Sequence, residues 1–325
     1  RRLSAVLLAG LLGTASASVP AAQAQAPAAD AAPLSHAADD RTRHGGDGAL
    51  LRLQVLLDRA RFSPGEIDAV AGSNQARALR GFQQARGLAV TGEADAAPWQ
   101  APELDSAPVL ADYTVTAADV AGPYTPIPED MMEKSRLPAL GYGSLLEALG
   151  ERFHASPELL GRLNPGSGPV RAGSVLKVPA VTAPAAPLKA ARVVVDGSEP
   201  VLRLLAGEGR MLAQYPASSG SEHDPLPLGE WNIVAVVHDP TFHYNPELFW
   251  DADPAHGKAK LAAGPNNPVG TVWIDLSKPH YGIHGTPEPR AVGKRQSHGC
   301  IRLTNWDAAA VAAAVDAQVP VTLQE

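Results

Sequence analysis

The last part of the chain alternates short apolar runs with turn residues. Branched apolar side chains dominate each run, and glycine, proline or polar residues separate the runs. The runs are Ala191–Asp196, Val201–Leu205, Met211–Ala217, Glu230–Val237 and Thr271–Leu276. Short runs of this kind between turn signals predict β-strands. Residues 190–325 are therefore expected to form a mainly β domain.

Two other features belong to this domain. Thr304 and Asp307 can cap an alanine-rich helix that runs to Val315, and Val321–Leu323 is expected to be a final strand. Asp239–Ala263 is long and shows few regular repeats. Because long segments of this kind are often lids or binding loops, we expect it to flank a ligand groove.

Residues 48–105 show helical periodicity instead. Apolar residues recur at the spacing of one helix face. They are Leu50, Leu53, Leu57 and Ala60 in a first helix, and Leu79 and Phe82 in a second. Pro64-Gly65 ends the first helix, Ser73 can cap the second, and Gly87 lies where a left-handed residue follows a helix. A third short helix is expected near Asp95.

Residues 111–180 mix strand and helix signals. The expected strands are Tyr113–Thr116 and Val175–Pro179. Between them, Ser144 and Glu147 predict a capping box, and Ser156-Pro157 predicts the start of a second helix. Leu146, Leu149 and Phe153 are expected to face inward. The order is strand, helix, helix, strand.

The first residues resemble an export signal. Arg1-Arg2 precede an apolar run from Leu3 to Ala17, and small-residue sites follow. This pattern is typical of a secretory signal peptide, predicted for residues 1–26, with an uncleaved anchor as the alternative. No transmembrane span is expected after cleavage. Residues 27–47 cannot bury a core and are expected to be a disordered tether.

Composition limits the domain organisation and the partners that can be expected. Hydrophobic residues make up 45% of the chain, enough for real cores, while 30 glycines and 30 prolines favour linkers such as Pro179–Lys189. We therefore expect a multidomain protein with a small three-helix domain, a small α+β module and a mainly β domain. The net charge of −7 argues against a nucleic-acid partner, which would need a basic stripe.

The candidate chemistry lies in Tyr281–Leu303. This stretch contains the only cysteine, Cys300, together with His284 and His298. Glycine and proline recur between His284 and Gly299, which predicts a strand end, a loop and a return strand that brings His284 beside Cys300. A neighbouring imidazole can take the proton of a thiol and so activate it as a nucleophile.

Acyl transfer by a thiol also needs donors for an oxyanion. Gly299 permits a sharp turn, so the amides of Gly299 and Cys300 can point to one spot. In a strand, Arg302 would lie on the same face as Cys300. In an exported protein an unpaired cysteine is a liability unless it reacts or pairs between chains, which argues against a buried structural role.

The motif Ser297-His298-Gly299-Cys300-Ile301-Arg302, preceded by His284-Gly285-Thr286, resembles the signature of the YkuD-type L,D-transpeptidases. Gly264–Gly270 resembles the lead-in of that family. Pro227–Trp231 resembles its turn, with Leu226-Pro227 where Thr-Pro is usual. The resemblance covers about Ala190–Glu325.

The resemblance implies a cysteine enzyme that forms 3–3 peptidoglycan cross-links. Cys300 would attack the carbonyl between the third and fourth residues of a tetrapeptide stem, and His284 would be the general base. Gly299, Ser297 and Gly285 would support the oxyanion site. No cofactor or metal is implied, and carbapenems are expected to acylate Cys300.

Substrate binding would fall to Arg302, Tyr244 and Trp250. Arg302 would hold a substrate carboxylate, or would form a structural salt bridge instead. His298 would be either a second catalytic histidine or a residue that orients the loop.

Two further resemblances imply attachment to the cell wall. The block from Ile67 to Gly92 resembles the three-helix peptidoglycan-binding domain (PG_binding_1-like), with Asp68-Ala69 where Asp-Gly is usual. Residues 111–180 resemble a LysM domain with an insertion at Ala117–Leu140. The implied partners are peptidoglycan tetrapeptide stems and glycan strands, and the implied location is the periplasm or cell wall. An unrelated helical module and a LysM-like spacer without ligand are the alternatives.

Other functions remain open. The same acyl-enzyme could pass to water, as in an L,D-carboxypeptidase, or to the lysine of an outer-membrane protein. The chain could also be a catalytically silent wall-binding protein. A zinc hydrolase is a further reading, with ligands among His280, His284, His298 and Cys300, although their spacing is not the usual one for zinc.

Overall fold

The computed structural model describes residues 35–36, 45–93, 107–181 and 188–325. These residues belong to one compact unit, Leu34–Glu325. Within the described ranges, no helix combines the length and the apolar character needed to cross a bilayer. The predicted signal peptide and most of the predicted tether lie outside the described residues.

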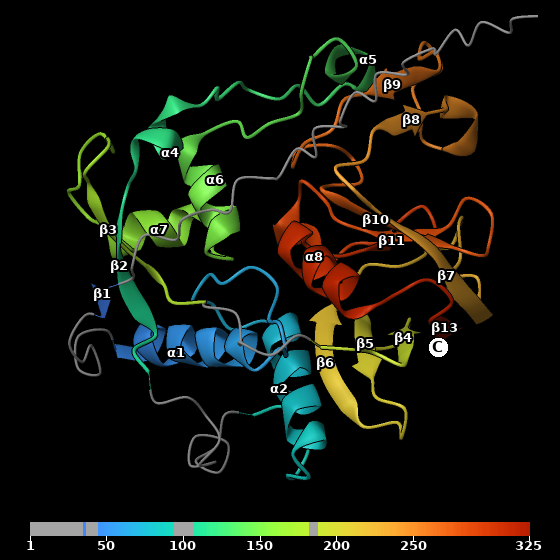
Figure 1. The fold of residues 1–325 in the computed structure, drawn as a ribbon, viewed down its shortest axis with the longest axis horizontal. Coiled ribbons are helices and arrows are strands. Elements are labelled where there is room, and N and C mark those ends of the chain that lie inside the picture. Colours follow the sequence, from blue (N-terminus) through green and yellow to red (C-terminus); the bar gives the residue numbers. More distant parts are fainter. Residues whose placement is uncertain (1–34, 37–44, 94–106, 182–187) are drawn as a thin grey trace, which may run out of the picture. The chain divides into compact units, whose positions relative to one another are not determined.

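An eight-stranded sheet dominates the C-terminal part of the unit, in the order β12-β11-β10-β7-β13-β4-β5-β6 (Figure 1). Its strands are β4 (Arg192–Asp196), β5 (Val201–Leu205), β6 (Met211–Pro216), β7 (Gly229–His238), β10 (Val272–Leu276), β11 (Gly282–His284), β12 (Ile301–Arg302) and β13 (Pro320–Gln324). Only the pairs β13–β4 and β11–β12 are parallel. The runs predicted as strands are strands, and the mainly β domain is confirmed.

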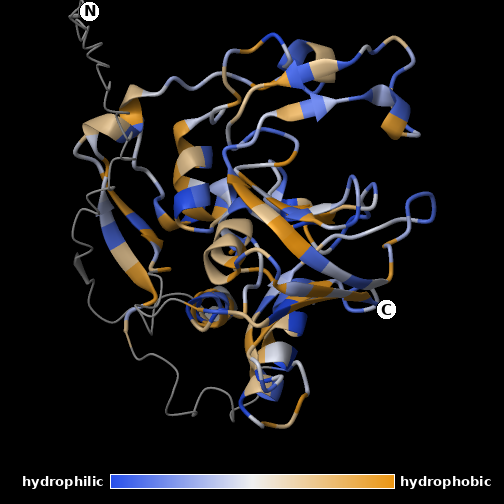
Figure 2. Ribbon diagram, turned by 45° about the vertical axis from the view of Figure 1, so that its right-hand side comes forward, coloured by the Kyte–Doolittle hydropathy of each residue, from blue (hydrophilic) through white to orange (hydrophobic). Residues whose placement is uncertain are grey.

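Alternating side chains of this sheet build the core. Val193 and Val195 of β4 pack with Leu202 and Leu204 of β5, and all four are buried. Helix α8 (Asn305–Ala314) packs against β10 and β11. Figure 2 shows apolar colours along α8 and the neighbouring strands.

The predicted cap of this helix is confirmed. The Thr304 hydroxyl accepts a hydrogen bond from the amide of Asp307 at 3.1 Å. The helix ends at Ala314, and Val315 is its C-cap. Because the cap orients the first turn, it also places Asn305 at the start of the helix, beside β10 and β11.

The segment Asp239–Ala263, predicted to be irregular, contains a hairpin (Figure 1). Strand β8 (Phe242–Tyr244) pairs antiparallel with β9 (Ala259–Leu261), and the 3-10 turn η1 (Pro246–Leu248) follows β8. The prediction missed this hairpin because three-residue strands are too short to show a period-2 pattern. We call residues 239–263 the hairpin segment.

Two helices form the described part of the predicted three-helix domain, α1 (Gly45–Arg59) and α2 (Ser73–Ala85). Gly87 has a φ of +66°, so the predicted left-handed residue is confirmed. The predicted Ser73 cap is wrong: Gly72 takes the N-cap position, and no side chain caps α2. The third helix predicted near Asp95 lies outside the described residues.

A three-stranded sheet and a helix pair form the middle part of the unit. Its elements are β1 (Ser35–His36), β2 (Leu110–Thr114), α4 (Ala117–Ala121), α5 (Met131–Lys134), α6 (Leu145–Arg152), α7 (Pro157–Leu163) and β3 (Val175–Pro179). Strands β2 and β3 are antiparallel. The predicted order of strand, helix, helix, strand is therefore observed, with α4 and α5 inside the predicted insertion. We call residues 107–181 the middle module.

Some local predictions for the middle module need correction. Leu146 is 38% exposed, so it does not face inward as Leu149 and Phe153 do; Leu145 packs against the core instead. The Ser144 hydroxyl caps α6, but the Glu147 carboxylate accepts from the amide of Gly143 rather than Ser144, so only half of the capping box forms.

The predicted tether is also partly structured. Ser35–His36 pairs with β2, and α1 begins at Gly45, before the expected boundary. The exposed backbone of an edge strand can pair with any sequence, because the ladder uses backbone groups only. Side-chain composition therefore did not reveal this contact.

Helix α1 joins the helical region to the middle module. Its residues Leu51 and Val55 pack into the core of the middle module, whereas Leu53 and Leu57 pack with Phe82 of α2. A helix that is apolar on two faces is typically buried between two layers. The two small modules therefore share one helix.

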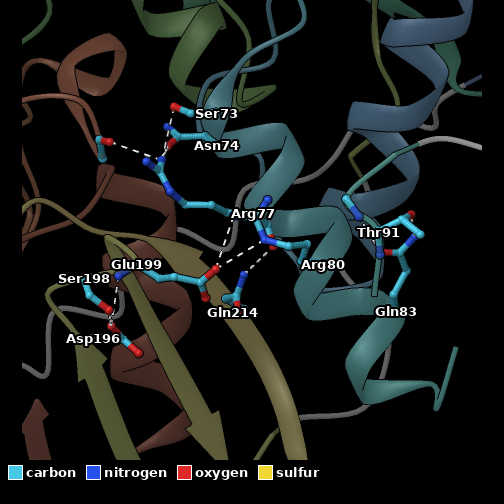
Figure 3. A network of polar contacts seen from close by, with 12 residues as sticks. Ser73, Asn74, Arg77, Arg80, Gln83, Thr91, Asp196, Ser198, Glu199 and Gln214 are labelled. Carbon is cyan, nitrogen blue, oxygen red and sulfur yellow. Dashed lines mark hydrogen bonds and ion pairs between the residues drawn. The ribbon is translucent and has the colours of Figure 1, made fainter. Parts of the chain in front are cut away.

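Helix α2 packs in turn against β6 of the large sheet (Figure 3). The Gln214 side chain donates to the carbonyl of Arg77 at 2.8 Å and lies where a Cβ on Gly81 would clash, at 2.7 Å. Arg80 and Glu199 form an ion pair at 3.2 Å. Gly81 is thus required for the close approach of helix and strand.

Candidate active site

The parallel pair β11–β12 positions the predicted catalytic residues. Ile283 lies opposite Ile301, and His284 lies opposite Arg302. Cys300 immediately precedes β12, beside Gly282 of β11. Because opposite residues in a ladder point to the same face and side chains alternate along each strand, Cys300, His284 and Arg302 share one face. The predicted strand, loop and return strand are confirmed.

His284 is buried and held by two contacts. Its side chain is 3% exposed, and its ring stacks on Trp273 of β10 with centroids 5.5 Å apart. Its Nδ1 lies 2.6 Å from the carbonyl oxygen of Gly285. Only a protonated nitrogen can donate to a carbonyl, so this bond places the proton on Nδ1 and leaves Nε2 able to accept one.

The charge state of His284 follows from its surroundings. Burial lowers its pKa to about 3, and the positive charge of Arg302 acts in the same direction. The ring is therefore neutral at physiological pH. A neutral imidazole with a free nitrogen has the form that a general base needs.

The Cys300 thiol is partly buried among backbone polar groups. Its Sγ is 3.7 Å from the carbonyl oxygen of His280. Burial raises the pKa of the thiol, while the backbone N–H of Gly282 and the charge of Arg302 lower it, and burial dominates. The site therefore combines a protonated thiol with a neutral histidine rather than a preformed ion pair.

Ser297 fixes the turn before Cys300. Its hydroxyl donates to the carbonyl of Cys300 at 2.6 Å and accepts from the amide of Gly220 at 2.8 Å. Gly299 has a φ of +95°, and a Cβ there would lie 2.8 Å from the ring of Tyr281. Among the described residues, the amides of Gly299 and Cys300 donate to no protein acceptor. Two free amides in a tight turn are suited to bind an anion.

Gly285 is confined by the helix behind it. Its amide donates to the carbonyl of Val272 at 3.2 Å. A Cβ at Gly285 would come within 2.1 Å of the Asn305 side-chain oxygen. The carbonyl that orients His284 is therefore backed by α8.

Arg302 and His298 connect the site to the hairpin segment. Arg302 Nη2 lies 3.3 Å from His298 Nδ1, and His298 Nε2 lies 2.8 Å from the Asp251 carboxylate. A guanidinium can only donate, so Nδ1 accepts and Nε2 donates to Asp251. Both ring nitrogens of His298 are occupied in this arrangement. Within the described part of the chain, no carboxylate forms an ion pair with Arg302.

The two aromatic residues predicted to bind substrate occupy different environments. Trp250 is 61% exposed and lies against His223, with ring centroids 4.4 Å apart. Tyr244 is 4% exposed, packs with Leu140 and Leu261, and contacts His256 through its hydroxyl at 3.0 Å. In this position Tyr244 supports the hairpin segment, whereas Trp250 is accessible to a ligand.

The predicted residues Cys300, His284, Arg302 and His298 thus lie in one region. Sequence reasoning missed Trp273, Asp251 and Asn305, which contact or back these residues. The sequence signal nearest to Asn305 is the helix cap at Thr304. A cap predicts where a helix begins, but it does not predict the contacts of the next side chain. Across the described ranges, no group of three or more metal-ligating side chains is found.

Two regions of the chain match known protein families. Residues 190–323 match the family described as the L,D-transpeptidase catalytic domain, YkuD. Residues 47–101 match the family described as "Putative peptidoglycan binding domain". The chain is 32% identical over 176 residues to the "Putative L,D-transpeptidase YkuD" of Bacillus licheniformis, covering 53% of this chain and 89% of that protein.

Two further relatives extend the comparison. The protein of the same name from Bacillus subtilis is 28% identical over 182 residues, covering 56% of this chain and 94% of that protein. Among solved structures, L,D-transpeptidase 3 from Mycobacterium tuberculosis, in complex with a faropenem-derived adduct, is 20% identical with a TM-score of 0.34. That match covers 48% of this chain and 76% of the other.

The mainly β domain and the sequence matches define a peptidoglycan-modifying enzyme. The chain belongs to the YkuD family of L,D-transpeptidases, and it also carries a peptidoglycan-binding domain in residues 47–101. The LysM resemblance of residues 111–180 stays a prediction.

Proposed function

We propose that this protein is an exported, cell-wall or periplasmic L,D-transpeptidase that forms 3–3 cross-links through an acyl-enzyme on Cys300. The thiol attacks the carbonyl between the third and fourth residues of a tetrapeptide stem. His284 Nε2 takes the thiol proton and gives it to the amine of the leaving D-alanine. The amine of a second stem then attacks the thioester, forms the new amide bond and frees the thiol.

One observation carries this proposal. Cys300, His284 and Arg302 share one face of a two-strand ladder, and the bond to Gly285 leaves His284 Nε2 unprotonated. Since thiol and imidazole are both neutral, the proton moves as the sulfur attacks, and the free amides of Gly299 and Cys300 can receive the developing oxyanion.

Donor recognition is assigned to the surface around the thiol. Arg302 has no carboxylate partner among the described ion pairs, so its charge is available to a carboxylate of the stem. Trp250 offers an exposed ring at the tip of the hairpin segment. The hairpin segment would then flank the donor groove, held to the catalytic turn by Asp251 and His298.

Wall attachment is assigned to the two small modules. The peptidoglycan-binding domain supports docking on the wall, and the strand–helix–helix–strand order of the middle module is compatible with LysM-like glycan binding. Both modules pack onto the catalytic domain. Docking would therefore present the catalytic site to the wall in one orientation.

The decisive experiment is intact mass of the mature protein after mixing with a tetrapeptide muropeptide or with a carbapenem. We expect a covalent adduct on the parent and none on Cys300→Ala. Product analysis then separates transfer to a stem amine from hydrolysis or transfer to a protein lysine. If neither protein forms an adduct while Cys300→Ala still binds purified sacculi, the chain is a wall-binding protein instead.

A further inference from the structure

The side chain of Asn305 lies directly behind the turn that orients His284. Its oxygen accepts from the amide of Thr271 at 3.2 Å, and it would contact a Cβ at Gly285 or at Gly270 at 2.1 and 2.0 Å. A Cβ at Gly270 would also lie 2.6 Å from the carbonyl carbon of Gly285. The Asn305 amide is therefore packed closely against the peptide group whose carbonyl holds His284 Nδ1.

Asn305 is held from outside the catalytic domain. Its Nδ2 donates to the carboxylate of Glu151 at 3.0 Å and to the carbonyl of Pro265 at 3.1 Å. Glu151 belongs to α6 of the middle module, and its second carboxylate oxygen accepts from the Tyr142 hydroxyl at 3.2 Å. A hydrogen bond to a carboxylate is stronger than one to a neutral acceptor, so Glu151 is the stronger of the two acceptors for Asn305.

Glu151 also lines a cavity of about 550 Å³ between the middle module and the catalytic domain, together with Glu147, Pro265 and Trp306. Its side chain is partly buried at this boundary. The hydrogen bond between Glu151 and Asn305 joins two parts of the chain that an alanine- and proline-rich linker separates in sequence.

We propose that Glu151 is a positioning residue for the catalytic histidine, acting through Asn305 and Gly285. This inference rests on the proposed role of His284 as general base. It makes the middle module part of the active-site scaffold, in addition to any glycan that it binds. Small displacements of a catalytic base lower the rate because reacting atoms must be aligned within a fraction of an ångström.

Glu147 provides a matched control. It lies one turn earlier on α6, lines the same cavity and also binds an asparagine of the catalytic domain, Asn266. Asn266 does not back Gly285. Glu147→Ala therefore removes an equal charge and a similar contact between the same two modules, while the hydrogen bond between Glu151 and Asn305 stays in place.

The test uses the full-length mature chain with its histidines labelled with ¹⁵N. Two quantities are measured for the parent, Glu151→Ala, Glu151→Gln and Glu147→Ala: the rate of carbapenem acylation, and the signal of the His284 ring N–H. We expect Glu151→Ala to slow acylation roughly fivefold and to broaden the ring signal. Glu151→Gln keeps an acceptor for Asn305, so it should stay within about twofold of the parent, as should Glu147→Ala.

Two results would overturn the proposal: Glu151→Ala with the parental rate and ring signal, or Glu147→Ala with losses as large as those of Glu151→Ala. Should Glu151→Ala fail to fold, Glu151→Leu takes its place, because it also removes the acceptor for Asn305. A parental rate and ring signal in Glu151→Leu would contradict the proposal as well. The ring signal needs no turnover. A parent without any adduct would therefore refute the proposed function, while the effect of Glu151 on the ring would still be measured.

Discussion

The two halves of the active site are held in different ways, although they lie on neighbouring strands. His284 is buried against Trp273, and its orienting carbonyl is backed by Asn305 and, beyond it, by Glu151. Cys300 sits in a turn held by Ser297, and its surroundings are completed by His298 and the hairpin segment. His284 is therefore held by residues of the protein interior, whereas Cys300 is held by residues near the surface.

This difference indicates that the two residues have different structural requirements. The base has a single required orientation, and a close-packed interior permits few alternatives. Under the proposed function, Cys300 would accept a bulky stem and release a product, which a movable cover would assist. Loops over active sites commonly have this role. Changes on the histidine side should therefore cost more than changes on the hairpin side.

The largest effect is expected from Gly285→Ala. The added methyl group would meet the Asn305 oxygen at 2.1 Å, so either the turn or α8 must shift. We expect carbapenem acylation to fall about 100-fold, with a loss of stability of about 1–3 kcal/mol from overpacking. Gly207→Ala, in an open turn with free space around its Cα, is the control and should behave like the parent in acylation and thermal melting. If Gly285→Ala were acylated at the rate of the parent, the turn at Gly285 would not be held rigidly by Asn305.

A smaller effect is expected from Asp251→Asn on the hairpin side. The substitution removes the charge that holds the His298 ring at 2.8 Å, in a partly exposed pair. Partly exposed pairs contribute on the order of 1 kcal/mol or less, so acylation by a muropeptide donor should fall about threefold. Alkylation of Cys300 by iodoacetamide, which needs no groove, should not change.

The control for this variant is Glu247→Gln, which breaks an exposed pair with Lys258 inside the same hairpin segment. It should leave both rates unchanged. A hundredfold loss of acylation in Asp251→Asn would contradict the proposed difference between the two sides of the site. His298 would then do more than hold the hairpin segment in place.

The smallest effect is expected from acidification. Because burial lowers the pKa of His284 to about 3, the ring stays neutral down to about pH 4. An ordinary histidine, with a pKa of about 6.5, would be about nine-tenths protonated at pH 5.5. The thiol, whose pKa burial raises, also stays protonated in this range. Acylation should therefore change less than about twofold between pH 5 and 7.5.

Glu151 titrates in the same window, because burial raises its pKa to about 6. The profile is therefore recorded for Glu151→Gln as well as for the parent. An inflection that disappears in Glu151→Gln belongs to the carboxylate. One that persists near pH 6.5 would mean that His284 is not the buried, neutral base described here.

Much of the fold could be predicted from the sequence because the local patterns of apolar and capping residues were strong. The strands around Val193, Leu202 and Ile274 show alternating or apolar runs, and the caps at Ser156 and Thr304 have residue types that favour them. The hairpin at Phe242 and the exposure of Leu146 were missed. The first is too short to show a period, and the second depends on which neighbours α6 meets.

The sequence by itself determined the family of this protein and the residues that are proposed to react. The motif around Cys300, the spacing to His284 and the turn at Gly299 pointed to the family and to the candidate residues, because these features lie within one short stretch. Only the tertiary structure decided that Nε2 of His284 is the free nitrogen, that His298 is committed to Asp251, and that Glu151 reaches the catalytic domain. Those contacts join residues far apart in the chain, and burial and hydrogen bonding between them exist only once the modules are packed together.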